Sequence, residues 1–196
     1  MAIDTRRIEA AVVELLTAIG EDPTRSGLAT TPQRIAEAYG EFFSGLDADP
    51  LDHLRETIDV GDRTGEAVVL RDIEFRSMCE HHLLPFTGVA HLAYLPDRRV
   101  VGLGRLPRVV ETLSSRPQVQ ERLTDEIADA LETGLEPRGV LVVLDAKHGC
   151  VNARGVRQAH SSTVTMASRG LLTDPVARAD VMALIGGRGD AGSRDG

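Results

Sequence analysis

Two short segments, far apart in the chain, carry the residue types best suited to metal or nucleophile chemistry. The first, Cys79-Glu80-His81-His82, places a thiol, a carboxylate and two imidazoles at four consecutive positions. The second, His148-Gly149-Cys150, holds the other of the chain's two cysteines. A lone thiol beside paired histidines favours metal or nucleophile chemistry over packing, so the two segments are candidates for one shared site.

The spacing of these residues fits a metal site. Cys79 and His82 are three positions apart, so on a turn or helix start both side chains can face one point, whereas His81 must point elsewhere. If the chain stays extended as far as Cys150, then His148 and Cys150 share one face of a strand. Thiolate and imidazole are the ligands that zinc favours, which predicts a metal site of Cys79, His82 and Cys150, with His148 as a further candidate.

The number of ligands decides what such a site can do. Four ligands, including His148, would make a closed Cys2His2 site with a structural role. Three ligands would leave one position to a water molecule whose pKa falls towards about 7, and would free histidines for proton transfer. Two other interpretations stay open: the cysteines can be small buried hydrophobic residues, or Cys79 can be a covalent nucleophile that needs no metal.

Arginines occur beside both segments. Arg105 and Arg108 lie just after Gly102-Leu103-Gly104, and Arg154 and Arg157 lie just after Cys150. In an acidic chain these local basic pairs fit a phosphorylated substrate, although each arginine taken singly is better explained as solvated surface.

A second group of polar residues precedes an apolar helical stripe. It consists of Gln118, Gln120 and Glu121. A carboxylate at this place can accept hydrogen bonds from both the ring N–H and the exocyclic amine of guanine, while solvation of a helix surface is the simpler explanation of the same residues.

Composition excludes several classes of protein. The chain has 196 residues, 42% of them hydrophobic, which fits one domain with a small helical extension. Its net charge of −8 argues against general binding to nucleic acid or to an anionic membrane. No apolar run approaches the roughly 18 residues that span a bilayer, and the N-terminus does not resemble a signal peptide. We therefore expect a cytoplasmic protein with reduced thiols and no Cys79–Cys150 disulfide.

The pattern of apolar residues predicts an α+β fold. Helical periodicity covers residues 5–19, 31–43 (with Thr31 as N-cap), 106–115 and about 116–136, and a last short helix starts at Asp174-Pro175. Strand-like runs cover 66–75, with a bulge near Arg71-Asp72, and 88–95, 100–101, 140–144 and 161–166. Residues 44–64 are expected to be a connection with a short helix. This order is typical of an α+β fold, because helices come first, followed by a group of antiparallel strands, two helices and two further strands.

Together these motifs resemble the GTP cyclohydrolase I family. The resemblance covers roughly Thr31 to Leu172 in the family's order and spacing. The segments that carry it are Cys79-Glu80-His81-His82, Val101-Gly102-Leu103, Arg116-Pro117-Gln118-Val119-Gln120-Glu121-Arg122-Leu123, His148-Gly149-Cys150, Arg154-Gly155-Val156-Arg157 and Ser161-Ser162-Thr163.

The resemblance implies a fold, an assembly and a reaction. The fold would be the tunnelling fold, an antiparallel sheet with two long helices on one side, assembled into a toroidal homodecamer with active sites between subunits. Residues 1–62 would form an N-terminal helical extension, 63–185 the catalytic domain and 186–196 a disordered tail. The reaction would open the imidazole ring of GTP by hydrolysis, release C8 as formate, rearrange the ribose and reclose to 7,8-dihydroneopterin triphosphate, the first step of pterin and tetrahydrofolate synthesis.

The resemblance also implies roles for individual residues. The zinc ligands would be Cys79, His82 and Cys150, and the proton-transfer pair would be His81 and His148. Glu121, with Gln120, would hold the guanine. The triphosphate would be bound by Arg105, Arg108 and Arg154, together with Arg34 from a neighbouring subunit.

One motif departs from the family's pattern. The family usually has Ser-Lys after Val-Gly-Leu, where this chain has Gly104-Arg105, followed by Pro107. A hydroxyl is lost, and a planar guanidinium replaces the point charge of lysine. Two alternatives to the full reaction are an enzyme of the same fold that stops at a formylated, ring-opened nucleotide, and a non-catalytic assembly protein with a closed Cys2His2 zinc site.

Overall fold

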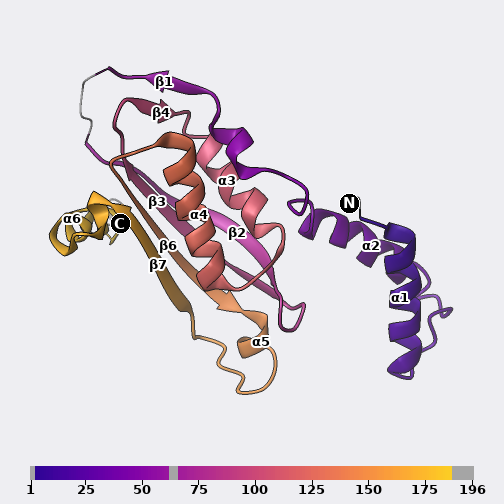
Figure 1. Ribbon diagram of the computed structural model, residues 1–196. Coiled ribbons are helices and arrows are strands. Elements are labelled where there is room, and N and C mark those ends of the chain that lie inside the picture. Colours follow the sequence, from indigo (N-terminus) through magenta and orange to yellow (C-terminus); the bar gives the residue numbers. More distant parts are fainter. Residues whose placement is uncertain (1–2, 62–65, 187–196) are drawn as a thin grey trace, which may run out of the picture.

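The computed structural model describes residues 3–61 and 66–186, which combine helices and strands as an α+β fold (Figure 1). The elements follow in the order α1 (Thr5–Ala18), α2 (Thr31–Phe42), the 3-10 helix η1 (Pro50–Leu54), β1 (Thr57–Asp59), β2 (Val68–Cys79), β3 (Pro85–Leu95), β4 (Arg99–Val101), α3 (Arg105–Ser114), β5 (Pro117–Gln118), α4 (Gln120–Leu135), β6 (Gly139–His148), α5 (Gly149–Asn152), β7 (Thr163–Gly170), the 3-10 helix η2 (Leu171–Thr173) and α6 (Pro175–Gly186). The predicted α+β class is confirmed.

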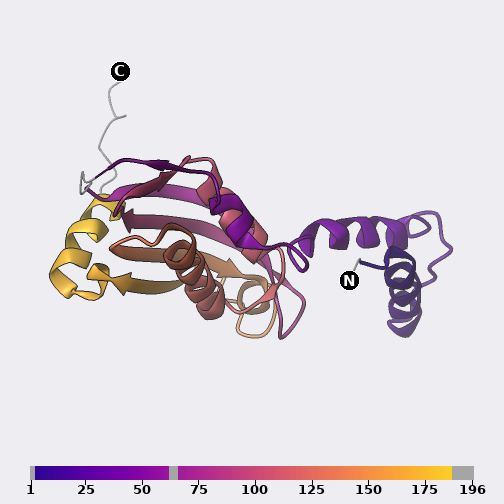
Figure 2. The same cartoon turned by 45° about the horizontal axis from the view of Figure 1, so that its top comes forward.

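The body of the molecule is a five-stranded sheet in the order β5-β2-β3-β6-β7. Strands β2, β3, β6 and β7 pair antiparallel, and β5 adds a short parallel pairing to the end of β2. Helices α3 and α4 lie side by side across one face of this sheet (Figures 1 and 2). The core between helices and sheet is mostly aliphatic, as the scarcity of aromatic residues requires.

Strand β6 is buried on both faces, because different helices cover them. Val140, Val142 and Leu144 face the core under α3 and α4, while Leu141 and Val143 alternate to the opposite face. There they pack with residues of η2 and α6, including Leu172 and Val181. The continuous β-branched run of 140–144 thus predicted a buried strand correctly.

Helices α1 and α2 form an arm that projects from the body (Figure 1). The C-terminal end of α2 contacts the sheet, where the Arg76 guanidinium lies 4.8 Å from the ring centroid of Phe42. Arg116 fastens the connection beyond α2 by donating to the carbonyl oxygens of Gly45 at 2.8 Å and Ala48 at 2.7 Å. Along the outer part of the arm, the apolar side chains of Val13, Leu15 and Ile19 remain exposed.

Several predicted boundaries need correction. Residues 100–101 pair with β1 in a separate two-stranded sheet and do not continue the main sheet. The helix expected from 116 starts at Gln120, because Pro117 and Gln118 pair with the end of β2 as β5. The N-cap of α2 is Thr30 rather than Thr31. The predicted bulge is confirmed by a register shift between Leu70 and Ile73.

Parts of two predictions, the connection at 44–64 and the tail at 186–196, lie outside the described residues, which omit positions 62–65 and 187–196. The predicted tail at 186–196 lies outside the described residues except for Gly186, which is the last residue of α6. Among the residues that the structure describes, no helix combines the length and the apolar character needed to cross a bilayer.

Candidate metal centre and active site

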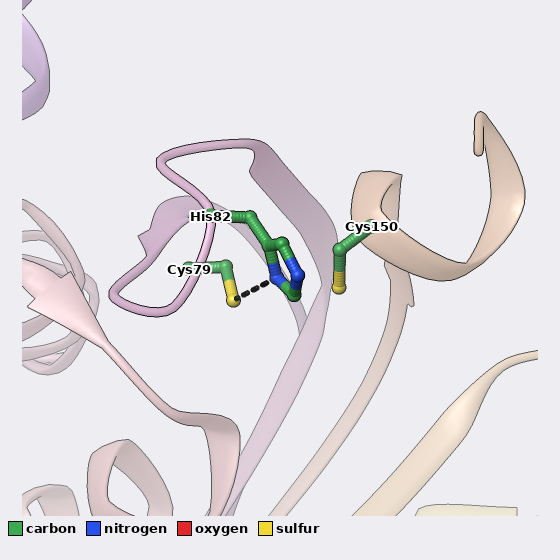
Figure 3. A group of neighbouring side chains, drawn as sticks. All are labelled: Cys79, His82 and Cys150. Atoms are coloured by element: carbon green, nitrogen blue, oxygen red, sulfur yellow. Dashed lines mark hydrogen bonds between the residues drawn. The ribbon is translucent and has the colours of Figure 1, made fainter. Parts of the chain in front are cut away.

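Cys79, His82 and Cys150 converge at one end of the sheet (Figure 3). One ligand atom from each residue lies within 4.8 Å of the other two, and Cys79 Sγ is 4.0 Å from His82 Nδ1. Around tetrahedral zinc, with Zn–S of about 2.3 Å and Zn–N of about 2.0 Å, neighbouring ligand atoms lie roughly 3.5 to 3.8 Å apart. The residues therefore fit a zinc ion after side-chain adjustments of about 1 Å.

A tight turn after β2 brings His82 back towards Cys79. The amide of Leu83 donates to the Cys79 carbonyl at 2.8 Å, and the amide of Cys79 donates to the Leu84 carbonyl at 2.9 Å. Leu83 adopts a left-handed backbone with φ of 50° to close the turn. The hydrogen bond from the Glu80 amide to the Gln118 carbonyl, at 3.0 Å, ties the turn to β5.

Cys150 reaches the cluster from a helical turn, so the condition under which His148 and Cys150 would share one face of a strand, an extended chain as far as Cys150, is not met. Strand β6 stops at His148, and Gly149–Asn152 form α5. A Cβ at Gly149 would lie 2.8 Å from the carbonyl oxygen of Pro85, so only glycine lets this turn approach β3 so closely. Because the helical turn begins at Gly149, Cys150 and His148 do not share one face of a strand.

His148 lies outside the metal-binding group. Its Nε2 is 2.7 Å from Gln120 Oε1, and its ring stacks on Phe86 with centroids 4.6 Å apart and planes 6° apart. Within the described part of the chain, the group thus has three members, as an open site requires.

Burial shifts the pKa of two groups at this centre. It raises the pKa of Cys150, with a further contribution from the neighbouring Cys79 thiol. Because a metal binds the thiolate form of cysteine, metal binding has to offset the raised pKa of Cys150, and it would release the thiol proton. Burial lowers the pKa of His148, although the charge of Glu121 opposes the shift. A neutral His148 has a lone pair with which to accept a proton.

His81 lies outside the candidate metal-binding group, in agreement with its spacing. Its side chain is 67% exposed, and its Nε2 lies 4.0 Å from Glu80 Oε1. Glu80 in turn accepts a hydrogen bond of 2.6 Å from Arg122 on α4. The contact between Glu80 and Arg122 could not be predicted from the sequence, because it joins residues 42 positions apart and no local pattern signals it.

The two predicted guanine-binding residues differ in exposure. Glu121 is exposed in the first turn of α4, where a ligand can reach it. Gln120 is only 1% exposed, and its amide nitrogen lies 2.8 Å from the carbonyl oxygen of Thr163 and 3.2 Å from that of Leu144. A contact between Gln120 and guanine stays a prediction.

The predicted triphosphate-binding arginines are scattered in the single chain. Arg154 reaches the centre, with its guanidinium 3.0 Å from His82 Nε2. Arg105 and Arg108 lie in the first turns of α3, beside a hollow of about 350 Å³, where they pair with Glu56 and Glu111. The opposite end of α3 leads into β5, which pairs with Cys79. Arg34 lies on α2, in the arm (Figure 1).

Comparison with known proteins gives a consistent result over most of the chain. The family model for GTP cyclohydrolase I matches residues 8–186. A protein of Leifsonia xyli subsp. xyli is 60% identical over 183 residues, which cover 93% of this chain and 96% of that protein. Proteins of Rhodopirellula baltica and Streptomyces griseus are 53% and 52% identical, and the matches cover 93% and 94% of this chain and 80% and 92% of theirs. All three are named GTP cyclohydrolase 1, and this chain belongs to the GTP cyclohydrolase I family.

Proposed function

We propose that this protein is a zinc-dependent GTP cyclohydrolase I. It opens the imidazole ring of GTP by hydrolysis, releases C8 as formate, and rearranges and recloses the product to 7,8-dihydroneopterin triphosphate. This reaction begins the synthesis of pterins and tetrahydrofolate.

The observation that carries the proposal is the group of Cys79, His82 and Cys150 with His148 beside it but not in it. Three protein ligands suit a catalytic zinc site, whereas a closed Cys2His2 site would need His148 as a ligand. Bound at these three residues, zinc would supply Lewis acidity and lower the pKa of a water molecule towards about 7.

The chain's own residues supply the remaining functions. Glu121 holds guanine through its ring N–H and exocyclic amine, while Gln120 adjoins it in the same helical turn. His81 and His148 move protons to and from the purine ring, including N7, whose protonation makes C8 electrophilic. Positioning matters because the enzyme must retain the opened intermediates through several steps.

Triphosphate binding requires more than one copy of this chain. Arg154 adjoins the metal centre, but Arg105 and Arg108 lie towards the far end of α3, and Arg34 lies on the arm. A homo-oligomer completes the site when neighbouring subunits bring these arginines to it. We propose the family's toroidal homodecamer, with residues 63–185 as a tunnelling-fold catalytic domain, 1–62 as a helical extension and 186–196 as a tail.

GTP and other copies of the chain are the proposed partners, and the cytoplasm is the proposed location. Nucleic acid and membranes are not proposed partners, since the chain carries a net charge of −8.

Product analysis tests the reaction. Purified zinc-loaded protein is incubated with GTP, with and without a chelator, and the products are identified by mass. Formate and a dihydroneopterin triphosphate, both abolished by chelation, are expected. A formylated, ring-opened nucleotide as the final product would favour the enzyme that stops early. Activity that survives complete removal of metal would instead support Cys79 as a nucleophile.

A further inference from the structure

Gln120 is held by four polar groups in a buried position, and these groups fix which way its amide points. The nitrogen lies 2.8 Å from the Thr163 carbonyl oxygen, 3.2 Å from the Leu144 carbonyl oxygen and 3.1 Å from Thr165 Oγ1. Main-chain carbonyl oxygens only accept hydrogen bonds, so the amide nitrogen must face them. The amide oxygen then necessarily faces His148.

The orientation of the Gln120 amide determines which nitrogen of the His148 ring carries the proton. Gln120 Oε1 lies 2.7 Å from His148 Nε2, and an amide oxygen can only accept. Nε2 must therefore carry the proton of this hydrogen bond. In the neutral ring the other nitrogen, Nδ1, keeps its lone pair. Within residues 3–61 and 66–186, no protein hydrogen bond occupies Nδ1 of His148.

The rest of the ring is fixed as well. Phe86 is 1% exposed and stacks on His148 with an interplanar angle of 6°, which prevents the imidazole from tilting. The network extends behind Gln120, where Thr124 and Thr165 share a hydrogen bond of 2.7 Å. Such supporting contacts hold a reacting group in one productive orientation.

We propose that Gln120 is a positioning residue, which holds His148 as the Nε2-protonated tautomer and leaves Nδ1 to exchange protons with the substrate. This inference rests on the proposed function for the identity of the substrate. It assigns guanine recognition to Glu121 and gives Gln120 a different task. Leaving its buried site to reach guanine would cost Gln120 its hydrogen bonds to two carbonyl oxygens.

The tautomer can be observed without any variant. Zinc-loaded protein containing 15N-histidine is studied by solid-state NMR, and the His148 signals are assigned by their loss in His148→Asn. A protonated Nε2 with an unprotonated Nδ1 is expected. An Nδ1-protonated ring, or a doubly protonated ring, would overturn the proposal. This result does not depend on turnover.

Kinetics of Gln120→Leu then distinguish positioning from substrate contact. The variant should show mixed His148 tautomers, a kcat lowered by about 10²-fold, and a KM for GTP changed by less than about threefold. Unchanged tautomers, or a loss confined to KM, would contradict the positioning role. Thr112→Val is the matched control, because it removes a partly buried side-chain hydrogen bond, to His53 at 2.9 Å, that lies outside the contacts of Gln120, so its His148 tautomer should stay as in the original protein.

The two proposals fail in different ways. If zinc-loaded protein leaves GTP unchanged but His148 is Nε2-protonated, the reaction is wrong and the role of Gln120 in setting the tautomer stands. If GTP is converted but His148 carries its proton on Nδ1, the reaction stands and the role of Gln120 is wrong.

Discussion

Arg122 on α4 donates a hydrogen bond of 2.6 Å to Glu80, the residue that follows Cys79 of the candidate metal centre. The same guanidinium reaches the Pro117 carbonyl at 3.1 Å and Gln118 Oε1 at 3.0 Å. One side chain thereby joins the helix, the short strand β5 and the turn between Cys79 and His82. The turn is supported from outside the set of candidate metal ligands, as is common where ligand geometry has to be held.

Replacing Arg122 should therefore weaken metal binding. In Arg122→Gln the Glu80 carboxylate loses its cationic partner and the turn loses a contact with α4. Because outer contacts of metal sites typically influence affinity by about 10- to 100-fold, we expect zinc affinity to fall by about tenfold. Competition with a chromogenic chelator measures the change.

Arg169→Gln is the matched control for this loss. Arg169 also bridges α4 and the sheet, through Asp125 at 2.9 Å and Asp129 at 2.8 Å, but it has no contact with the turn between Cys79 and His82. Replacing Arg169 should leave zinc affinity unchanged. Equal losses in the two variants would show that Arg122 acts only through general stability.

The departure at Gly104-Arg105 predicts a measurable effect on substrate binding. A Cβ at Gly104 would meet nothing within 4 Å, and Arg105 is exposed and paired with Glu56. The double variant Gly104→Ser, Arg105→Lys, which introduces the family's usual pair, should therefore fold with stability changed by less than about 0.5 kcal/mol. We expect it to bind GTP more tightly, because it gains a hydroxyl donor and a flexible cation.

Steady-state kinetics test this expectation. The KM for GTP should fall by up to about tenfold, equivalent to about 1.4 kcal/mol, with kcat maintained. Arg55→Lys, which changes another exposed arginine paired with a carboxylate, controls for the general effect of the exchange. A higher KM in the double variant would mean that Arg105 already binds the triphosphate better than lysine does.

Because Tyr94 is buried, we expect the protein to lose stability at alkaline pH. Burial raises the pKa of Tyr94 above its usual value of about 10, although the Val101 amide, which donates to the hydroxyl at 3.4 Å, opposes the shift. The unfolded chain therefore loses this proton at a lower pH than the folded chain does. The contribution of the neutral hydroxyl is complete below pH of about 10 and is lost as the pH rises through the folded pKa.

Tyr94→Phe removes this titration and keeps the buried ring. Urea unfolding at about pH 8 and about pH 10.5, at equal protein concentration, should show a smaller alkaline loss of unfolding free energy in the variant. Parallel losses in both proteins would assign the alkaline effect to other groups.

The sequence predicted those features that depend on local periodicity. Leu123, Ile127 and Leu131 recur at helical spacing, and all three are fully buried on α4. The three members of the candidate metal site were also predicted, since Cys-x-x-His is a local pattern and the chain offers only one further cysteine, Cys150.

Features set by contacts between distant residues escaped prediction. Pro117 and Gln118 leave the expected helix because they pair with Met78 and Cys79, nearly 40 positions away. The separation of Arg105 from the metal centre depends on the direction of α3 in the folded chain, which spacing along the sequence does not reveal. The environment of Gln120 likewise comes from strands β6 and β7, which follow it in the sequence.

The zinc content of His148→Asn shows whether the metal site is open, with three protein ligands. The variant protein is purified with zinc, dialysed and assayed for metal by mass spectrometry, beside Cys150→Ser. We predict that His148→Asn retains zinc as the original protein does while losing turnover, and that Cys150→Ser loses the metal. Loss of zinc from His148→Asn to the same extent as from Cys150→Ser would rule out the open site, because it would make His148 the fourth ligand of a closed structural site.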